Sequence, residues 1–159
     1  MTRVFVLTNH KGGVGKSTSA TNIAYGLIGL LRRSWATNCR VLLMDMDSQA
    51  HASLVTTGHK NYGADNSLYT VLMADRREAP NVLANGLVQS TWDDDLHVLP
   101  ASPMLEGAER ELMGVAGAPY RLAEPHRQSL CRNCDRHPSL ILIDDRDGAA
   151  GCHRCHCTS

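Results

Sequence analysis

Short apolar runs separated by polar turns recur along the chain and predict buried strands. These runs occupy residues 4–7, 41–44, 96–99 and 140–143, and each is followed by polar or turn-forming residues. A continuous apolar run of this length is typical of a strand that is covered on both faces, as in a parallel sheet. The pattern therefore predicts a sheet of buried, parallel strands.

Two stretches change to a period of three to four residues, which predicts helices. One begins at Ser17, and Arg32 and Arg33 lie where cations favour the end of a helix. The other follows Ser102, which precedes Pro103 in the pattern of a helix cap and a first helical position. The apolar positions assigned to the two helices are Ala20, Ile23, Ala24, Leu27, Leu30 and Leu31 in the first, and Met104, Leu105, Ala108, Leu112 and Met113 in the second.

Strands that alternate with helices predict right-handed crossovers in a doubly wound α/β sheet. Between residues 51 and 95 the pattern is weak, and a short helix at 68–73 is the one element expected there. In a doubly wound sheet, ligands bind beyond the carboxyl ends of the strands. Polar residues follow three of the apolar runs, at 8–16, at 45–49 and at Asp144. The chemistry is therefore expected to converge at this edge of the sheet.

Composition excludes several classes of protein. Hydrophobic residues make up 43% and charged residues 20% of the 159 residues, which is typical of a globular chain. The 16 basic and 16 acidic residues balance, so binding to nucleic acid or anionic lipid needs a local patch. The apolar runs are far shorter than the ~20 residues that cross a bilayer, and the first residues lack the pattern of a signal peptide. We therefore expect a cytoplasmic protein without a membrane span.

The stretch NHKGGVGKST, residues 9–18, has the composition of a phosphate-binding loop. It lies between a predicted strand and a predicted helix, where backbone N–H groups and the helix dipole attract phosphate. Lys16 can reach the β- and γ-phosphates, Ser17 can offer its hydroxyl to Mg²⁺, and Thr18 can bond the α-phosphate side. The residues expected to bind the phosphates are Gly12, Gly13, Val14, Gly15, Lys16, Ser17 and Thr18.

The sequence KGGVGKST resembles the deviant Walker A motif of the ParA/MinD family of P-loop ATPases. The mark of that motif is an early lysine, here Lys11, whereas His10 occupies the position where the usual loop has glycine. In the family, two subunits enclose two ATP molecules, and the early lysine reaches the nucleotide of the partner. The resemblance implies that Lys16 acts in cis and Lys11 in trans. A charge supplied by the partner would stabilise the phosphates as an arginine finger does.

The stretch VLLMDMDSQAHASL, residues 41–54, resembles the second motif of the family, and its continuation favours the ParA branch. Asp45 and Asp47 match the two acids of that motif and Gln49 matches its glutamine, while Ser48 replaces a proline. The resemblance implies that Asp47 orients or activates the attacking water and that Asp45 supports the Mg²⁺ shell. Carboxylates at a strand end that faces a phosphate loop suit this hard cation.

The stretch LILIDD, residues 140–145, resembles the Walker B strand, so Asp144 is expected to bind Mg²⁺ through water. Three acids on the second predicted helix, Glu106, Glu109 and Glu111, are expected to form a solvated face. The expected catalytic residues are Lys11, Lys16 and Asp47, and the expected metal ligands are Ser17, Asp45 and Asp144.

The resemblance implies a P-loop NTPase fold, with a doubly wound and mainly parallel sheet, whose C-terminal part is missing. We expect a partial ParA-like ATPase domain over residues 1–145 and a disordered Cys/His-rich tail over residues 146–159. The tail has three explanations that stay open: truncation or a shifted reading frame, a zinc site, or reduced thiols. The zinc alternative rests on ribbon-like spacing in the pairs Cys131 with Cys134 and Cys152 with Cys155.

The function implied by the resemblance is that of a ParA-type ATPase in plasmid or chromosome partitioning. Its cofactors would be ATP and Mg²⁺, and ATP binding would produce a sandwich homodimer. Nonspecific DNA and a ParB-like protein are the partners that the family implies. Two alternatives stay open: an inactive fragment that keeps the nucleotide loop, and a zinc-binding module at the C-terminus.

Overall fold

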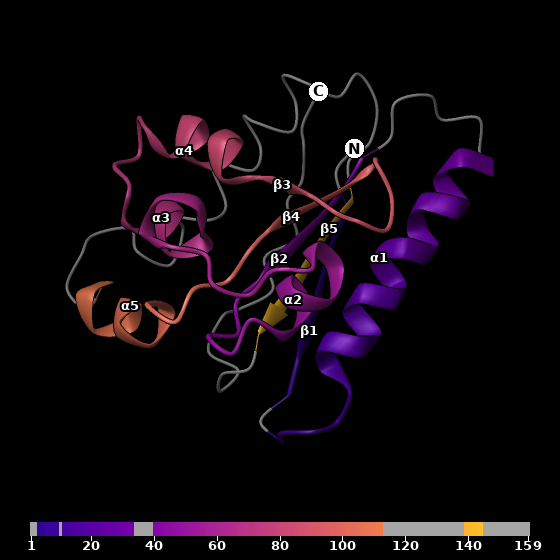
Figure 1. Cartoon of the computed structure of the whole chain (residues 1–159), viewed down its shortest axis with the longest axis horizontal. Helices are drawn as coiled ribbons and strands as arrows, with labels where there is room; N and C mark the ends of the chain where they lie inside the picture. The colour runs from indigo at the N-terminus through magenta and orange to yellow at the C-terminus, as the bar shows by residue number, and fades with distance from the viewer. Residues whose placement is uncertain (1–2, 10, 34–39, 113–138, 145–159) are drawn as a thin grey trace.

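The computed structural model describes residues 3–9, 11–33, 40–112 and 139–144 (Figure 1). In this part of the chain, one sheet has the strand order β1-β5-β2-β4-β3. All neighbouring strands are parallel except the pair β3 and β4, which is antiparallel. The predicted doubly wound, mainly parallel α/β fold is confirmed. The strands are β1 (Arg3–Thr8), β2 (Val41–Asp45), β3 (Val88–Gln89), β4 (Leu96–Leu99) and β5 (Ser139–Asp144).

Helices cover both faces of the sheet, with α1 and α2 on one face and α3, α4 and α5 on the other (Figure 1). The central strand β2 separates the two layers, and all of its residues are buried. Val41 and Leu43 pack against α1 and α2, whereas Leu42 and Met44 pack against α3, α4 and α5. The helices are α1 (Lys16–Arg33), α2 (His51–Thr57), α3 (Leu68–Met73), α4 (Ala79–Gly86) and α5 (Leu105–Leu112), with a 3-10 turn η1 (Ala64–Asn66) before α3.

The elements that the sequence predicts are present, and besides the turn η1 three further elements lie in the region 51–95. The helix expected at 68–73 matches α3, and the strand expected at 41–44 extends to Asp45. The unexpected elements are α2, α4 and β3, which have seven, eight and two residues. Elements of one or two turns show too few periods for a hydrophobic pattern to stand out.

The buried face of α1 differs from the predicted one. Two of the apolar positions assigned to it, Ile23 and Leu30, are 41% and 62% exposed. The helix buries a threonine instead, and the Thr21 hydroxyl donates a hydrogen bond to the carbonyl of Thr18 (3.0 Å). That hydrogen bond satisfies the buried hydroxyl, so a polar residue is tolerated at this buried position. The apolar pattern of the sequence does not include Thr21 for this reason. The residues that α1 buries are Ala20, Thr21, Ala24 and Ile28.

The start of α5 keeps the predicted serine cap, although the helix itself begins later than expected. Ser102 Oγ accepts a hydrogen bond from the N–H of Met104 (3.3 Å), and α5 begins at Leu105. The carbonyl of Ser102 also accepts the N–H of Leu105 (3.0 Å). A turn therefore intervenes between the cap and the helix, and it carries the chain from the end of β4 onto the α3 side of the sheet.

The acids of α5 are exposed as predicted where the structure describes them, but they also accept hydrogen bonds. Glu106 Oε1 accepts from the Ser48 hydroxyl (3.2 Å) and Glu111 Oε2 from the Tyr69 hydroxyl (2.8 Å). The side chain of Glu109 lies outside the described residues. The acidic face of α5 therefore contacts the turn after β2 as well as solvent.

The tail expected at 146–159 and the cysteine pairs of the zinc alternative lie outside the described residues. Within the part that is described, no group of three or more His, Cys, Asp or Glu side chains could hold a metal ion. No helix among the described residues is long and apolar enough to cross a membrane. The division into a domain of residues 1–145 and a tail stays a prediction.

The half-buried His97 on β4 should make the stability of the fold depend on pH. Its Nδ1 is buried without a hydrogen-bond partner among the described residues, and burial lowers the pKa of the imidazole below 6.5, with the nearby Arg40 charge acting in the same direction. The unfolded chain therefore binds a proton at a pH where the folded chain does not.

We expect the contribution of His97 to the free energy of unfolding to be complete above about pH 6.5. This contribution should be lost as the pH falls through the lowered pKa. His97→Gln should remove this part of the decline, which urea unfolding at pH 7.5 and pH 5.5 would measure. Equal losses of stability in the two proteins would show that His97 is not the titrating group.

Candidate phosphate-binding site

The glycine loop, which we define as residues 9–15, connects β1 to α1 through two residues with positive φ. Gly13 has φ 72° and Gly15 has φ 83°, a region that side chains with a Cβ rarely adopt. The carbonyl of Gly15 accepts the N–H of Ser19 (2.8 Å), so the chain passes directly from the turn into the helix. The first turn of an α-helix has N–H groups without partners inside the helix, and this end of α1 is therefore suited to an anion.

A cavity of about 610 Å³ lies at this end of α1. All the residues predicted to bind phosphates line it, and so do Asp47, Gln49 and His51 from the turn after β2 and the start of α2. Its far wall includes Val55 of α2 and Trp92. Neither His51, Val55 nor Trp92 was a predicted site residue, because their proximity to the loop depends on how α2 packs beside α1. The sequence signal that could have indicated His51 is its spacing, four residues after Asp47.

The two lysines of the loop occupy different positions. Lys16 is half-buried and lines the cavity, and its Nζ donates to the carbonyl of Lys11 (3.2 Å). Lys11 is exposed and is not among the residues that line the cavity. Its backbone N–H donates to Asn9 Oδ1 (3.0 Å), which fixes the start of the loop. The structure therefore brings Lys16 to the cavity and presents the Lys11 side chain at the surface beside it.

Asp45 lies under the cavity rather than in its wall. It is the last residue of β2, fully buried, and it is not among the residues that line the cavity. Its Oδ2 accepts from the N–H (2.8 Å) and the hydroxyl (2.7 Å) of Ser53, and its Oδ1 accepts from the N–H of Asp47 (3.2 Å). Burial raises the pKa of Asp45, against the hydrogen bonds from Ser53. These contacts give Asp45 a structural role, and its predicted place in a Mg²⁺ shell stays a prediction.

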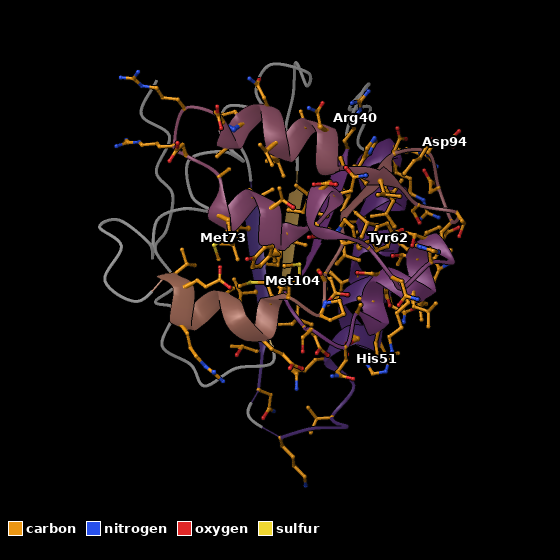
Figure 2. The ribbon with its side chains drawn as sticks, turned by 60° about the vertical axis from the view of Figure 1, so that its left-hand side comes forward. Arg40, His51, Tyr62, Met73, Asp94 and Met104 are labelled. Carbon is orange, nitrogen blue, oxygen red and sulfur yellow. The ribbon has the colours of Figure 1, made fainter. Side chains whose placement is uncertain are left out.

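Asp47 is oriented by its own turn and lines the cavity. Its Oδ1 accepts the N–H of Gln49 (2.9 Å), and its carbonyl accepts the N–H of Ala50 (2.8 Å). Its Oδ2 lies 4.0 Å from Nδ1 of the exposed His51. Figure 2 shows His51 at the end of the molecule where the glycine loop lies, opposite to Arg40. The second carboxylate oxygen of Asp47 thus lies near His51, which also lines the cavity.

Ala50 lets the turn pass directly into α2. It has φ 54° and ψ 33°, and it is the one non-glycine residue with positive φ in the described part of the chain. The left-handed conformation costs a residue with a Cβ about 1 kcal/mol. The carbonyl of Ala50 accepts the N–H of Leu54 (2.9 Å), the first bond of the helix. Residues 45–50, which we call the acidic turn, are therefore held in one strained shape.

Asp144 ends β5 at the same edge of the sheet. Its backbone is in register with Thr8, where the glycine loop begins, and the preceding Ile143 is in register with Asp45. The backbone of Asp144 therefore lies between the ends of β1 and β2, at the edge of the sheet where the sequence predicts that polar residues converge. The side chain lies outside the described residues, so its role as a metal ligand stays a prediction.

Comparison with known proteins places this site in a family. The sequence profile of an AAA domain family matches residues 2–144. The chain is 37% identical over 142 residues to the chromosome-partitioning ATPase Soj of Thermus thermophilus, across 89% of this chain and 45% of that protein. The chain belongs to the ParA/MinD-type family of P-loop ATPases. It is also 35% identical to the chromosome partitioning protein ParA of Myxococcus xanthus, over 79% of this chain and 39% of that one.

Solved structures share the ParA/MinD-type fold. Cobyrinic acid a,c-diamide synthase from Mycobacterium smegmatis, with a bound ATP analog and magnesium, has a TM-score of 0.64 and 29% identity, over 91% of this chain and 51% of that one. Apo McdA of Cyanothece has a TM-score of 0.63 at 19% identity, over 90% and 50%, which shows the fold alone. This ParA-like chain spans about half the length of the curated relatives it matches.

The glycine loop should tolerate a side chain at one glycine and not at another. Gly15→Ala places a Cβ at φ 83°, and we expect a loss of about 1 kcal/mol in the free energy of unfolding. Gly12→Ala is the matched control, because Gly12 lacks a positive φ and has nothing within 4 Å of an added Cβ. Urea unfolding followed by circular dichroism measures both, and equal losses would contradict the loop geometry.

Proposed function

We propose that this ParA-like chain binds ATP with its triphosphate in the cavity and hydrolyses it. The observation that carries the proposal is that residues 12–15 of the glycine loop, Lys16 and Asp47 line one cavity. Two further facts support it: the chain belongs to a family of P-loop ATPases, and a structural relative at 29% identity was solved with an ATP analog and magnesium.

The loop supplies the forces that a triphosphate needs. Backbone N–H groups of the first turn of α1 and the positive end of the helix dipole attract the phosphate oxygens. Lys16 adds a full charge from the cavity wall. Its present hydrogen bond to the carbonyl of Lys11 is one that a phosphate oxygen would replace, because an ammonium bonds more strongly to an anion than to a carbonyl.

We propose a Mg²⁺ site with one change from the predicted ligand set. Ser17 lines the cavity, and the backbone of Asp144 lies at the same edge of the sheet. Ser17 and Asp144 would hold the ion, which prefers oxygen ligands and neutralises charge on bound phosphates. Asp45 is left out of this set because both of its carboxylate oxygens accept hydrogen bonds in a buried position.

Asp47 is the residue that we propose to orient the attacking water. Its Oδ1 is engaged by the N–H of Gln49, which leaves Oδ2 as the oxygen that can accept a proton from water or align it. The carboxylate comes from the acidic turn, whose strained residue Ala50 fixes the direction of the chain. The water would then attack from the side of the cavity formed by α2.

We extend the proposal to a dimer in which Lys11 acts on the nucleotide of the partner. Lys11 is exposed next to the cavity while Lys16 is inside it, so the two charges can serve different nucleotides. By analogy with the relatives alone, we also propose ATP-dependent pairing, a role in plasmid or chromosome partitioning and a cytoplasmic location. The same analogy suggests nonspecific DNA and a ParB-like protein as partners.

A chain that keeps the loop but lacks hydrolysis is the second candidate, and one observation favours it. Val4, Phe5 and Val6 of β1 are 37%, 39% and 43% exposed, although a strand of this type is normally covered on both faces. β1 also lies at the edge of the described sheet. A sheet that is open at the strand leading into the glycine loop would hold that loop less firmly.

Replacement of Lys16 separates these candidates. We expect the chain to bind ATP and to hydrolyse it with Mg²⁺, and Lys16→Ala to weaken binding by at least about tenfold because a charged partner of the phosphates is lost. Asp47→Asn should keep binding and reduce kcat about a hundredfold. Isothermal titration and phosphate release measure the two quantities, with the exposed Lys60→Ala as control. Binding without turnover in the unmodified chain would support the second candidate, and equal activity in Lys16→Ala would contradict both.

Replacement of Lys11 tests the role in trans. We expect Lys11→Ala to bind a non-hydrolysable ATP analog as the unmodified chain does, because its side chain lies outside the cavity, but to remain monomeric with it. Analytical ultracentrifugation with and without the analog measures the association, and Lys60→Ala should still dimerise. Dimers of Lys11→Ala, or monomers of the unmodified chain, would remove the proposed role of Lys11.

A further inference from the structure

We infer that Ser53 is a positioning residue for the proposed hydrolysis: it ties the acidic turn to the segment between β4 and α5 and so directs Asp47 into the cavity. The inference rests on the proposed function for its catalytic consequence. Ser53 itself does not line the cavity and lies on the buried side of α2. It therefore acts through other residues.

The directions of the hydrogen bonds at Ser53 follow from the donors available. Ser53 is fully buried, and its Oγ lies 3.0 Å from the backbone nitrogen of Ala101 and 2.7 Å from Asp45 Oδ2. The N–H of Ala101 can only donate, so Ser53 Oγ accepts that bond and gives its single hydrogen to Asp45. The hydroxyl thus connects the end of β2 with the chain that leaves β4.

The connection continues from Asp45 to the residue proposed to orient water. Asp45 Oδ1 accepts the N–H of Asp47 (3.2 Å), and Asp47 Oδ1 accepts the N–H of Gln49 (2.9 Å). Asp45 and Ala101 are fully buried, whereas Asp47 and Gln49 line the cavity. A series of hydrogen bonds therefore runs from the core of the protein to the cavity wall.

A second hydrogen bond ties the same turn to α5, which follows that segment. The hydroxyl of Ser48 donates to Glu106 Oε1 on α5 (3.2 Å). This contact is exposed and contributes little on its own. Together with the bond from Ala101 to Ser53, it holds the acidic turn at two points against the start of α5.

The chemistry of the connection favours positioning over mere filling of space. A buried carboxylate is costly unless its oxygens are hydrogen-bonded, and an apolar side chain at position 45 would avoid that cost. A carboxylate accepts directional bonds on both oxygens, and these fix the N–H and the hydroxyl of Ser53 on the helix and the N–H of Asp47 on the turn. Removing the Ser53 hydroxyl leaves the N–H of Ala101 buried and one oxygen of Asp45 with fewer donors, so the turn should lose its fixed direction.

The test compares Ser53→Ala with a matched control on the same helix. Thr56→Ala removes an equally buried hydroxyl, which donates to the carbonyl of Ala52 (2.7 Å). We expect Ser53→Ala to reduce kcat by about tenfold to a hundredfold through misplacement of Asp47. The Kd for ATP should stay within about threefold of that of the unmodified chain, because Ser53 does not line the cavity and no contact with ATP is lost. Thr56→Ala should keep kcat within about twofold of that of the unmodified chain, because the Thr56 hydroxyl bonds within its own helix. Ser53→Thr retains the hydroxyl and should therefore keep most of the kcat of the unmodified chain.

Each outcome decides the inference. An unchanged kcat in Ser53→Ala, or an equal loss in Thr56→Ala, would overturn it. If Ser53→Ala does not fold, Ser53→Cys takes its place, because a thiol is a weak donor. If the unmodified chain does not hydrolyse ATP, the proposed function fails separately. Hydrogen exchange at the Gln49 amide then decides the positioning: faster exchange in Ser53→Ala than in Thr56→Ala supports it, and equal exchange overturns it.

Discussion

The carboxylate of Asp45 is the point on which the local structure of the site depends. A charged group without solvent needs donors on both oxygens, and Asp45 obtains them from Ser53 and from the backbone of Asp47. To supply these donors, the chain must reverse within a few residues and begin α2 above the end of β2. The left-handed Ala50 is the consequence of that tight reversal. The wall of the cavity opposite the glycine loop therefore follows from one buried charge.

The parallel sheet brings the other half of the site to the same place. β1, β5 and β2 are paired in register, so the ends at Thr8, Asp144 and Asp45 lie side by side. Parallel strands of a doubly wound sheet direct all their carboxyl ends to one edge, where the helices begin. The glycine loop and the acidic turn meet there although about thirty residues separate them in the sequence. Strand register, more than any single contact, gives the cavity two chemically different walls.

The sequence predicts those parts of the fold that depend on local pattern. The apolar patterns at 68–73 and 41–44 indicate the helix and the strand that the structure shows, and the glycines that the phosphate loop requires are visible in the sequence. By contrast, α2 buries Ser53 and Thr56, which a hydrophobic pattern treats as exposed. Their burial depends on hydrogen bonds to groups distant in the sequence or one turn away, and single-sequence periodicity carries no trace of such bonds.

The same limit explains why the sequence did not show which acid of the acidic turn is buried. In the motif, Asp45 and Asp47 are chemically equal and two residues apart, and both are plausible at a site for Mg²⁺. Strand alternation does not separate them, because residues i and i+2 of a strand face the same side. The chain leaves the strand between them, and only the hydroxyl of Ser53 and the position of Ala101 determine which acid is buried.

The two lysines show how one loop can serve two purposes. The carbonyl of Lys11 accepts the hydrogen bond from Lys16 Nζ, whereas Lys11 itself is exposed and does not line the cavity. A phosphate loop with an early lysine therefore has an internal charge and an external one, five residues apart. In the proposed dimer, the external charge would act on a nucleotide that approaches the rim of the cavity. A second copy of the chain, with a nucleotide bound beside its own Lys11, would meet that condition symmetrically.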